Sequence, residues 1–135
     1  MDETTRREPA FEAESEAYSL FQRGVGFLRE RHPAQAAMLL AHALRLEPGR
    51  NSIREALGRA EFALGMHERA AARFRDVLSH APDNDYAHYA LGRCLLELGR
   101  ADEARAHLRL ARALRPQSDL YREALAALDL SLIHI

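Results

Sequence analysis

Seven histidines and one cysteine are the residues of this 135-residue chain whose types could bind a metal ion or act as a nucleophile. A zinc site in a protein needs such ligands at short, characteristic spacings, for example two histidines four residues apart on one face of a helix. No cluster of cysteines or aspartates joins the histidines, and none of the following has a ligand spacing: His32, His42, His67, His80, His88 and His107. We therefore expect no metal site and no metal cofactor.

The single cysteine, Cys94, cannot form an internal disulfide bond. It lies on the apolar side of a predicted helix and no neighbouring feature would lower its pKa, so we expect a buried, unreactive thiol. The glycines of Gly24-Val25-Gly26 do not follow a predicted strand, as a phosphate-binding loop requires, and we assign both to helix packing. No catalytic or cofactor-binding residue is predicted, and we expect the chain not to be an enzyme.

The charge distribution argues against several classes of ligand. The formal net charge is −1, from 19 basic residues, all arginine, and 20 acidic ones. Arg69, Arg73 and Arg75 are interleaved with Glu68 and Asp76, which is typical of a solvated helix face and not of a nucleic-acid site. No apolar run reaches the roughly 18 residues that a membrane span needs, and no signal-peptide core is present. We expect a cytoplasmic protein, and the lysine-free, arginine- and alanine-rich composition suggests a bacterial source.

An internal repeat of 34 residues predicts the elements that position the rest of the chain. Five series of residues recur in one register: Gly24, Gly58 and Gly92; Ala36, Ala70 and Ala104; Leu40, Phe74 and Leu108; Ala43, Val77 and Ala111; Pro48, Pro82 and Pro116. One such series would be weak support, but five at the same period indicate three structural repeats.

Each repeat is predicted to contain two helices. In the third, residues 85–98 place apolar and small residues at the spacings of an amphipathic helix, which Gly99 should end in a left-handed conformation. Residues 101–114 form the second helix, which ends before Pro116. The N-cap residues expected for the first helices are Asn51, Asp85 and Asp119.

The repeated glycines and alanines are expected to let the two helices of a repeat approach closely. Glycine inside a helix costs about 0.5–1 kcal/mol relative to alanine, so three glycines in register need a packing reason. Larger residues would fill the space between the helices, among them Leu40, Phe74 and Leu108. Since one hairpin cannot bury its apolar faces alone, the repeats must stack on one another.

The period, the paired small residues and the closing proline resemble the tetratricopeptide repeat (TPR) family, above all in residues 57–84 and 91–118. The resemblance covers residues 17–118 and implies an all-α fold, a right-handed α-solenoid of three helix-turn-helix repeats with a C-terminal capping helix. Arg23 and Glu61 depart from the family pattern and should weaken individual contacts. The expected bounds are 17–50, 51–84 and 85–118 for the repeats and 119–129 for the capping helix.

The two ends are expected to differ from the repeats. Residues 1–9 are polar and predicted to be disordered, and the TPR domain is predicted to span residues 10–129. Pro9 suits a helix start, so the first helix is expected from about residue 10, with Phe11 packed on the first repeat. Residues 130–135 break the helical pattern, and one reverse translation of them resembles a transposase adapter used for sequencing libraries. We interpret them as an artefact, which leaves the native C-terminus open and allows a fourth repeat instead of a cap.

The resemblance implies that the first helices line a concave groove that binds the ligand. Aromatic residues and arginines dominate binding energy at interfaces, and Arg59 and Arg93 occupy equivalent positions one repeat apart. The groove residues expected by position are Tyr18, Phe21, Val25, Leu28 and Arg29 in the first repeat, Ser52, Glu55, Arg59, Phe62 and Ala63 in the second, and Tyr86, Tyr89, Arg93, Leu96 and Glu97 in the third.

An alternative explains the same residues without a ligand. Phe21 and Phe62 would only pack between repeats, and the two groove arginines would pair in solvent with Glu55 and Glu97. One subclass of the family grips a C-terminal carboxylate with lysine and asparagine, but Phe21 and Val25 lie where that grip would begin. We therefore hypothesise a different ligand, an extended or helical segment with apolar anchors and some acidic character, which Arg59 and Arg93 would meet.

We predict that the chain binds a protein or peptide as an adaptor or scaffold, with no nucleic-acid or membrane partner and no cofactor. Three other roles stay open at this level. The chain could be a chaperone for a secreted protein, the regulatory TPR portion of a larger enzyme or signalling protein, or a module that self-associates through its concave face or terminal helix.

Overall fold

The computed structural model describes residues 8–133, with side chains up to residue 130. This part of the chain contains seven helices and no strand. The helices are α1 (Glu16–Arg29), α2 (Pro33–Leu46), α3 (Asn51–Ala63), α4 (His67–His80), α5 (Asp85–Glu97), α6 (Ala101–Leu114) and α7 (Asp119–Ile133). The predicted disorder falls mostly on residues 1–7, which lie outside the described residues.

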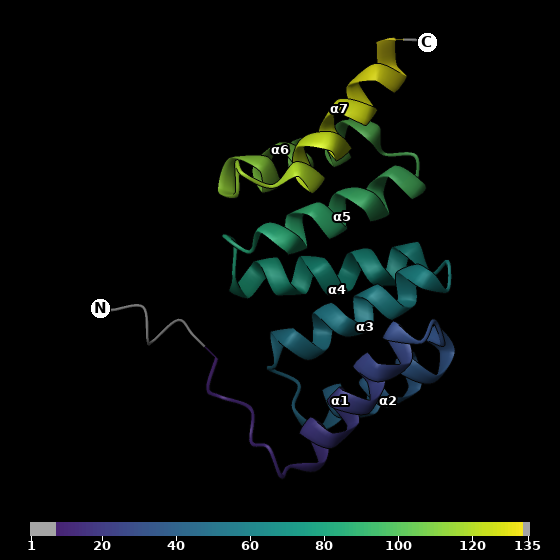
Figure 1. The fold of residues 1–135 in the computed structure, drawn as a ribbon, viewed down its shortest axis with the longest axis vertical. Coiled ribbons are helices and arrows are strands. Elements are labelled where there is room, and N and C mark those ends of the chain that lie inside the picture. Colours follow the sequence, from purple (N-terminus) through teal and green to yellow (C-terminus); the bar gives the residue numbers. More distant parts are fainter. Residues whose placement is uncertain (1–7, 134–135) are drawn as a thin grey trace, which may run out of the picture.

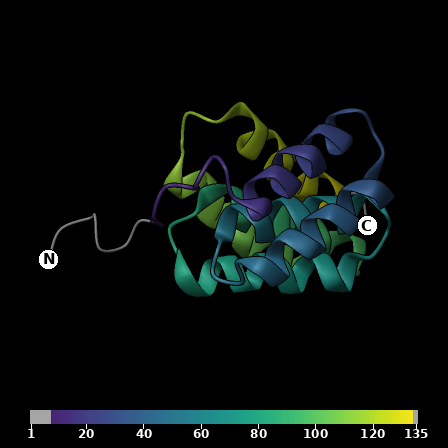
Figure 2. The ribbon, with the colours of Figure 1, turned by 90° about the horizontal axis from the view of Figure 1, so that it is seen from below.

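The helices form three hairpins that stack along the long axis of the molecule, with α7 at the far end (Figure 1). Each helix packs mainly on its neighbours in sequence, and α3 also touches both α1 and α5. Figure 2 looks at the stack from its α1 end and shows the hairpins lying over one another. The fold is the predicted all-α solenoid of helical hairpins.

A glycine in each first helix allows the two helices of its hairpin to touch. A Cβ atom added to Gly24, Gly58 or Gly92 would lie 2.7, 2.8 or 3.0 Å, respectively, from the nearest atom across the hairpin. Those atoms belong to the buried side chains Leu40, Phe74 and Leu108. The predicted packing role of these three glycines is confirmed. Gly26 does not share it, because a Cβ there would meet nothing within 4 Å, so the packing assigned to Gly26 is wrong.

The turns inside the hairpins use one residue with left-handed backbone. Gly65 and Gly99 have φ angles of +79° and +77°, as predicted for Gly99. The first repeat has Arg31 at the equivalent position, with φ 63°. A residue with a side chain adopts this conformation at a cost of roughly 1–2 kcal/mol, so the first turn is less favourable than the other two.

The helix starts differ from the predicted caps by one residue. Asn84 Oδ1 accepts a hydrogen bond from the backbone N–H of Ala87 at 3.0 Å, and Ser118 Oγ accepts one from that of Tyr121 at 3.3 Å. The residues predicted as caps are instead the first helical residues: Asn51, Asp85 and Asp119. At α5 and α7 two neighbouring residues, Asn84 and Asp85 or Ser118 and Asp119, are both of cap-forming types, so residue type alone could not distinguish the positions. At α3 the N-cap is Arg50, which makes no side-chain cap.

The first helix begins at Glu16 and not near residue 10 as predicted. Ser15 is its N-cap, and the Ser15 hydroxyl oxygen accepts a hydrogen bond from the backbone N–H of Tyr18 at 3.0 Å. Residues 8–15 therefore precede the helix. Phe11 packs on the first repeat, as predicted, beside buried residues of α1, α2 and α3.

The second repeat buries an ion pair where the other two have apolar residues, Phe27 and Leu95. Glu61 is 4% exposed, and its carboxylate accepts hydrogen bonds from Arg73 Nε at 3.0 Å and Nη2 at 3.3 Å. The departure from the family pattern at Glu61 is thus compensated by two charge-assisted hydrogen bonds.

The last helix, α7, continues to Ile133, four residues beyond the predicted end at residue 129. It covers the third repeat with Tyr121, Leu125 and Leu128, which cluster with Tyr89, Leu108 and Ala111. A capping helix and the first helix of a fourth repeat would both pack in this way. The artefact interpretation of residues 130–135 stays a prediction, and residues 134 and 135 lie outside the described part.

A cluster around Asp85 ties α7 to the third repeat. The carboxylate of Asp85 accepts hydrogen bonds from the Tyr121 hydroxyl at 2.6 Å and from Arg115 Nε at 3.0 Å. Partial burial raises the pKa of Asp85, but these two hydrogen bonds outweigh it, so the net pKa is lowered. The ionised carboxylate is therefore the form that holds α7.

Replacing Gly58 with alanine should destabilise the protein by about 1–3 kcal/mol, because the new methyl group would overlap the buried ring of Phe74. Gly26→Ala is the matched control, since it lies in α1 with open space around it. It should stabilise the protein by about 0.5–1 kcal/mol through helix propensity. Urea unfolding monitored by circular dichroism measures both, and equal effects would contradict the packing role.

The hydrogen bonds of Asp85 should make the stability of the folded protein depend on pH. Folding lowers the pKa of Asp85, so the ionised carboxylate adds to the free energy of unfolding. This stabilisation is complete above the pKa of about 3.9 that Asp85 has in the unfolded chain, and it is lost as the pH falls through the folded-state pKa. Asp85→Asn should therefore lower the melting temperature at pH 7, with the difference vanishing as the pH falls below about 4. The exposed Asp83→Asn serves as control, and a difference that persists unchanged at the lowest pH would disprove the assignment.

Candidate peptide-binding groove

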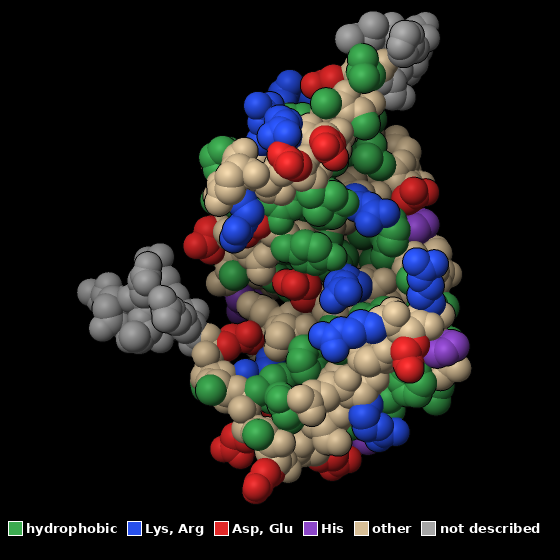
Figure 3. All heavy atoms as spheres, in the orientation of Figure 1, with side chains coloured by type: hydrophobic (Ala, Val, Ile, Leu, Met, Phe, Trp, Pro, Cys, Tyr) green, Lys and Arg blue, Asp and Glu red, His purple; other side chains and the backbone are tan. Residues whose placement is uncertain are grey.

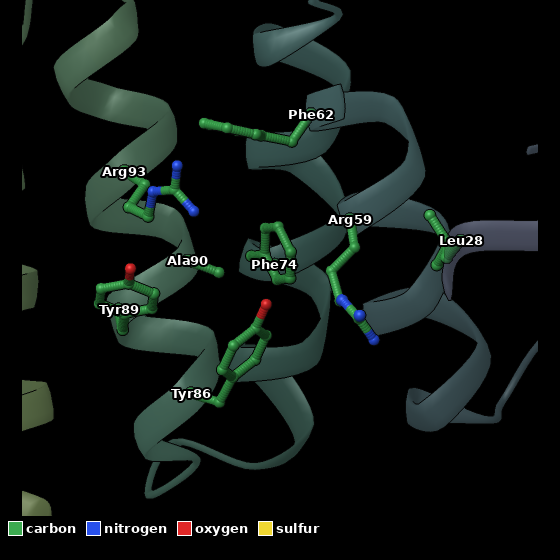
Figure 4. Close-up of a pocket in the computed structure, with 8 residues that line it drawn as sticks. All are labelled: Leu28, Arg59, Phe62, Phe74, Tyr86, Tyr89, Ala90 and Arg93. Carbon is green, nitrogen blue, oxygen red and sulfur yellow. The ribbon is translucent and has the colours of Figure 1, made fainter. Parts of the chain in front are cut away.

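A cavity of about 190 Å³ opens where the first helices of the three repeats lie along one side of the solenoid. Figure 4 shows the side chains that line it. They are Leu28 from α1, Arg59 and Phe62 from α3, Phe74 from α4, and Tyr86, Tyr89, Ala90 and Arg93 from α5. The α5 residues are spaced three, four and seven apart, which places them on one helix face.

Aromatic rings form the walls of the cavity. The ring centroid of Tyr86 lies 6.3 Å from that of Phe74 and 6.0 Å from that of Tyr89. The guanidinium carbon of Arg93 lies 4.6 Å from the centroid of Phe62 and 5.9 Å from that of Tyr89, within cation–π range of both. Arg93 thus links the α3 wall to the α5 wall while its charge stays exposed.

The charge at the mouth of the cavity comes mainly from arginine. Arg59 and Arg93 are exposed, and neither forms an ion pair with any residue from 8 to 130, Glu55 and Glu97 included. Burial raises the pKa of Glu55, and the hydrogen bond from Asn84 and the charge of Arg59 offset it only in part. Figure 3 shows apolar side chains beside arginines at the middle of this face.

Six of the predicted groove residues come together here: Leu28, Arg59, Phe62, Tyr86, Tyr89 and Arg93. Two lining residues were not predicted. Ala90 lies four residues after Tyr86 on the same helix face, a spacing that could have identified it. Phe74 belongs to a second helix and was assigned only to packing, so no signal in the first helices pointed to it.

The other predicted groove residues lie elsewhere. The rings of Tyr18 and Phe21 lie 5.2 and 5.3 Å from Phe11, centroid to centroid, and outside the cavity. Val25 packs into the core of the first hairpin, and Glu55 receives a hydrogen bond of 3.5 Å from Asn84. The remaining five are exposed but do not line the cavity: Arg29, Ser52, Ala63, Leu96 and Glu97. Ligand binding by any of these residues stays a prediction.

Neither Cys94 nor any described histidine lines the cavity. Cys94 is fully buried, as predicted, and burial raises its pKa to about 11, so it is a thiol at neutral pH. Among the described residues no group of three or more histidine, cysteine, aspartate or glutamate side chains could hold a metal ion. None of the helices described has the length and hydropathy to cross a membrane.

One histidine pair was not foreseen from the sequence. The Nδ1 atoms of His88 and His107 lie 3.0 Å apart, and His88 Nε2 lies 2.8 Å from the carbonyl oxygen of Pro82. If His88 Nε2–H donates to that carbonyl, the neutral ring has Nδ1 free to accept a hydrogen bond from His107. The residues are 19 apart, a separation that no ligand spacing in the sequence would have marked.

Comparison with known protein families identifies the repeat. The sequence model described as Tetratricopeptide repeat matches residues 61–128, which is 68 of the 135 residues. This chain belongs to the tetratricopeptide repeat family. A comparison of the TPR chain with curated protein sequences finds no match.

Solved TPR structures share the fold at low sequence identity. The first TPR domain of Spaghetti (RPAP3), bound to the HSP90 peptide SRMEEVD, has a TM-score of 0.82 and 15% identity over 87% of this chain and 94% of that one. The Yersinia enterocolitica translocator chaperone SycD has a TM-score of 0.77 and 16% identity over 93% and 86%. MamA from Desulfovibrio magneticus has a TM-score of 0.82 and 18% identity over 87% and 67%. At identities this low, the structural likeness shows that these chains share the TPR fold, and it does not show what this chain binds.

Proposed function

We propose that this TPR chain binds a segment of a partner protein in the cavity between α3 and α5, as an adaptor or scaffold in the cytoplasm of a bacterial cell. The observation that supports this most is an aromatic-lined cavity whose mouth carries two arginines that form no ion pair with residues 8–130. An apolar side chain of the partner would fill the cavity, and an acidic side chain beside it would meet Arg59 or Arg93. Such a buried anchor with adjacent charge is how interface binding energy is usually concentrated.

The structural neighbours are compatible with this role. One is a TPR domain in complex with a peptide that contains two glutamates and an aspartate, and another is a chaperone of a secretion translocator. The likeness to SycD over 93% of the chain supports a second candidate, a chaperone for a secreted protein. In both cases the chain would act by binding and not by catalysis.

The proposal predicts that charge reversal at the cavity weakens ligand binding. Peptides selected from a displayed random library on the wild-type chain should be rich in an apolar residue next to an acidic one. The variant with Arg59→Glu and Arg93→Glu should bind them at least about tenfold more weakly by calorimetry, because both attractive charges become repulsive.

Arg109→Glu with Arg112→Glu is the matched control, since it reverses two exposed charges on α6, away from the cavity. It should leave the affinity unchanged. Equal affinity of the cavity variant and the wild type, with both folded by circular dichroism, would rule out this binding site. A chaperone role would further require that the partner loses solubility or secretion when the chain is absent.

A further inference from the structure

The segment that precedes α1 is held against the first two repeats by an aromatic anchor. The ring centroid of Phe11 lies 5.2 Å from that of Tyr18 and 5.3 Å from that of Phe21. Beneath it lies a buried cluster contributed by three helices: Leu20, Ala43 and Ile53. A seat for one aromatic side chain is thus built from α1, α2 and α3.

Arg50, the residue before α3, contacts both the backbone and the ring of this segment. Its Nη1 donates a hydrogen bond to the carbonyl oxygen of Pro9 at 2.6 Å, and its guanidinium carbon lies 4.1 Å from the centroid of Phe11. Glu47 orients the guanidinium through an ion pair of 3.2 Å. The Arg50 side chain is only 12% exposed, so its interaction with the ring is weakly screened by solvent.

Glu8 adds a third contact at the N-terminus of α3. Its carboxylate accepts a hydrogen bond from the backbone N–H of Asn51, the first residue of that helix. The N-cap residue Arg50 provides no side-chain cap, so this N–H would otherwise lack a protein partner. A carboxylate is also favoured there by the helix dipole. The segment is therefore recognised through an acid and, three residues later, an aromatic ring.

The seat is larger than the segment it holds. Cavities of about 270 and 390 Å³ lie along Pro9 and Arg50. Ala10, between the two anchor residues, is exposed. The site therefore selects the first and fourth positions of the segment and leaves room for larger side chains at the two positions between them.

We propose that this seat is a second peptide site, which takes an extended partner segment of the pattern Glu-x-x-Phe in place of the chain's own residues 8–11. Every contact uses a carboxylate, a ring or a backbone carbonyl, which any such segment supplies. The N-terminus of α3 favours a carboxylate at the first position of the partner segment. The chain's own segment is tethered through residues 12–15 and acts as an internal competitor at an effective concentration of order millimolar.

A fluorescent peptide with the sequence of residues 8–15, EPAFEAES, tests the site. The variant with Glu8→Gln and Phe11→Ala, which vacates the seat, should bind it roughly tenfold or more tightly than the wild type in anisotropy titrations. Adding Arg50→Gln to that variant should abolish binding, as should replacing the peptide phenylalanine by alanine. Arg109→Glu with Arg112→Glu, which reverses two exposed charges on α6, should leave binding unchanged. The dependence on Arg50 separates this site from the cavity between α3 and α5, which Arg50 does not line.

The proposal is overturned if the folded Glu8→Gln, Phe11→Ala variant does not bind the peptide. It is also overturned if this variant binds the peptide equally well when the peptide phenylalanine is replaced by alanine. If the vacated variant unfolds, the wild type decides the question. Millimolar peptide should then shift the amide resonance of the chain's own Phe11 in NMR spectra, because the added peptide displaces this residue from the seat. An unchanged resonance at saturation of the titration overturns the proposal equally.

Discussion

The close approach of two helices at Gly24, Gly58 and Gly92 is the constraint on which the rest of the solenoid depends. Without a Cβ at these positions, one large side chain of the second helix lies against the first helix and is buried. Phe74 shows how this packing reaches the functional surface. Its ring fills the space beside Gly58 and also faces Tyr86 in the cavity. A change in the packing of α3 on α4 at Gly58 would therefore move a residue that lines the cavity.

Arginine performs two separate tasks in a chain that has no lysine. Arg73 pairs with the buried carboxylate of Glu61 through two hydrogen bonds. Arg50 and Arg93 each lie over a phenylalanine ring while keeping a charge available for other contacts. These tasks need a planar group that forms directed hydrogen bonds and stacks on rings, which the compact ammonium group of lysine does not provide.

The groove expected from the repeat pattern is divided into two parts in the folded chain. Phe11 covers Tyr18 and Phe21 at the first repeat, while the second and third repeats leave the cavity with Arg59 and Arg93 open. The division results from a segment outside the repeats. A partner that binds both parts would have to displace residues 8–11. Binding at the first repeat therefore requires that this segment leave its site.

The sequence by itself determined the helices, the hairpin packing and the burial of Cys94, because glycine, proline and apolar spacings act over one or two turns of a helix. It also predicted six cavity residues, since equivalent positions in a repeat face the same side. Tertiary structure alone decided the role of Phe74 in the cavity, the pairing of His88 with His107 and the seating of Glu8 on α3. Each of these joins residues from different elements, and their separation in sequence follows no helical period that a pattern could reveal.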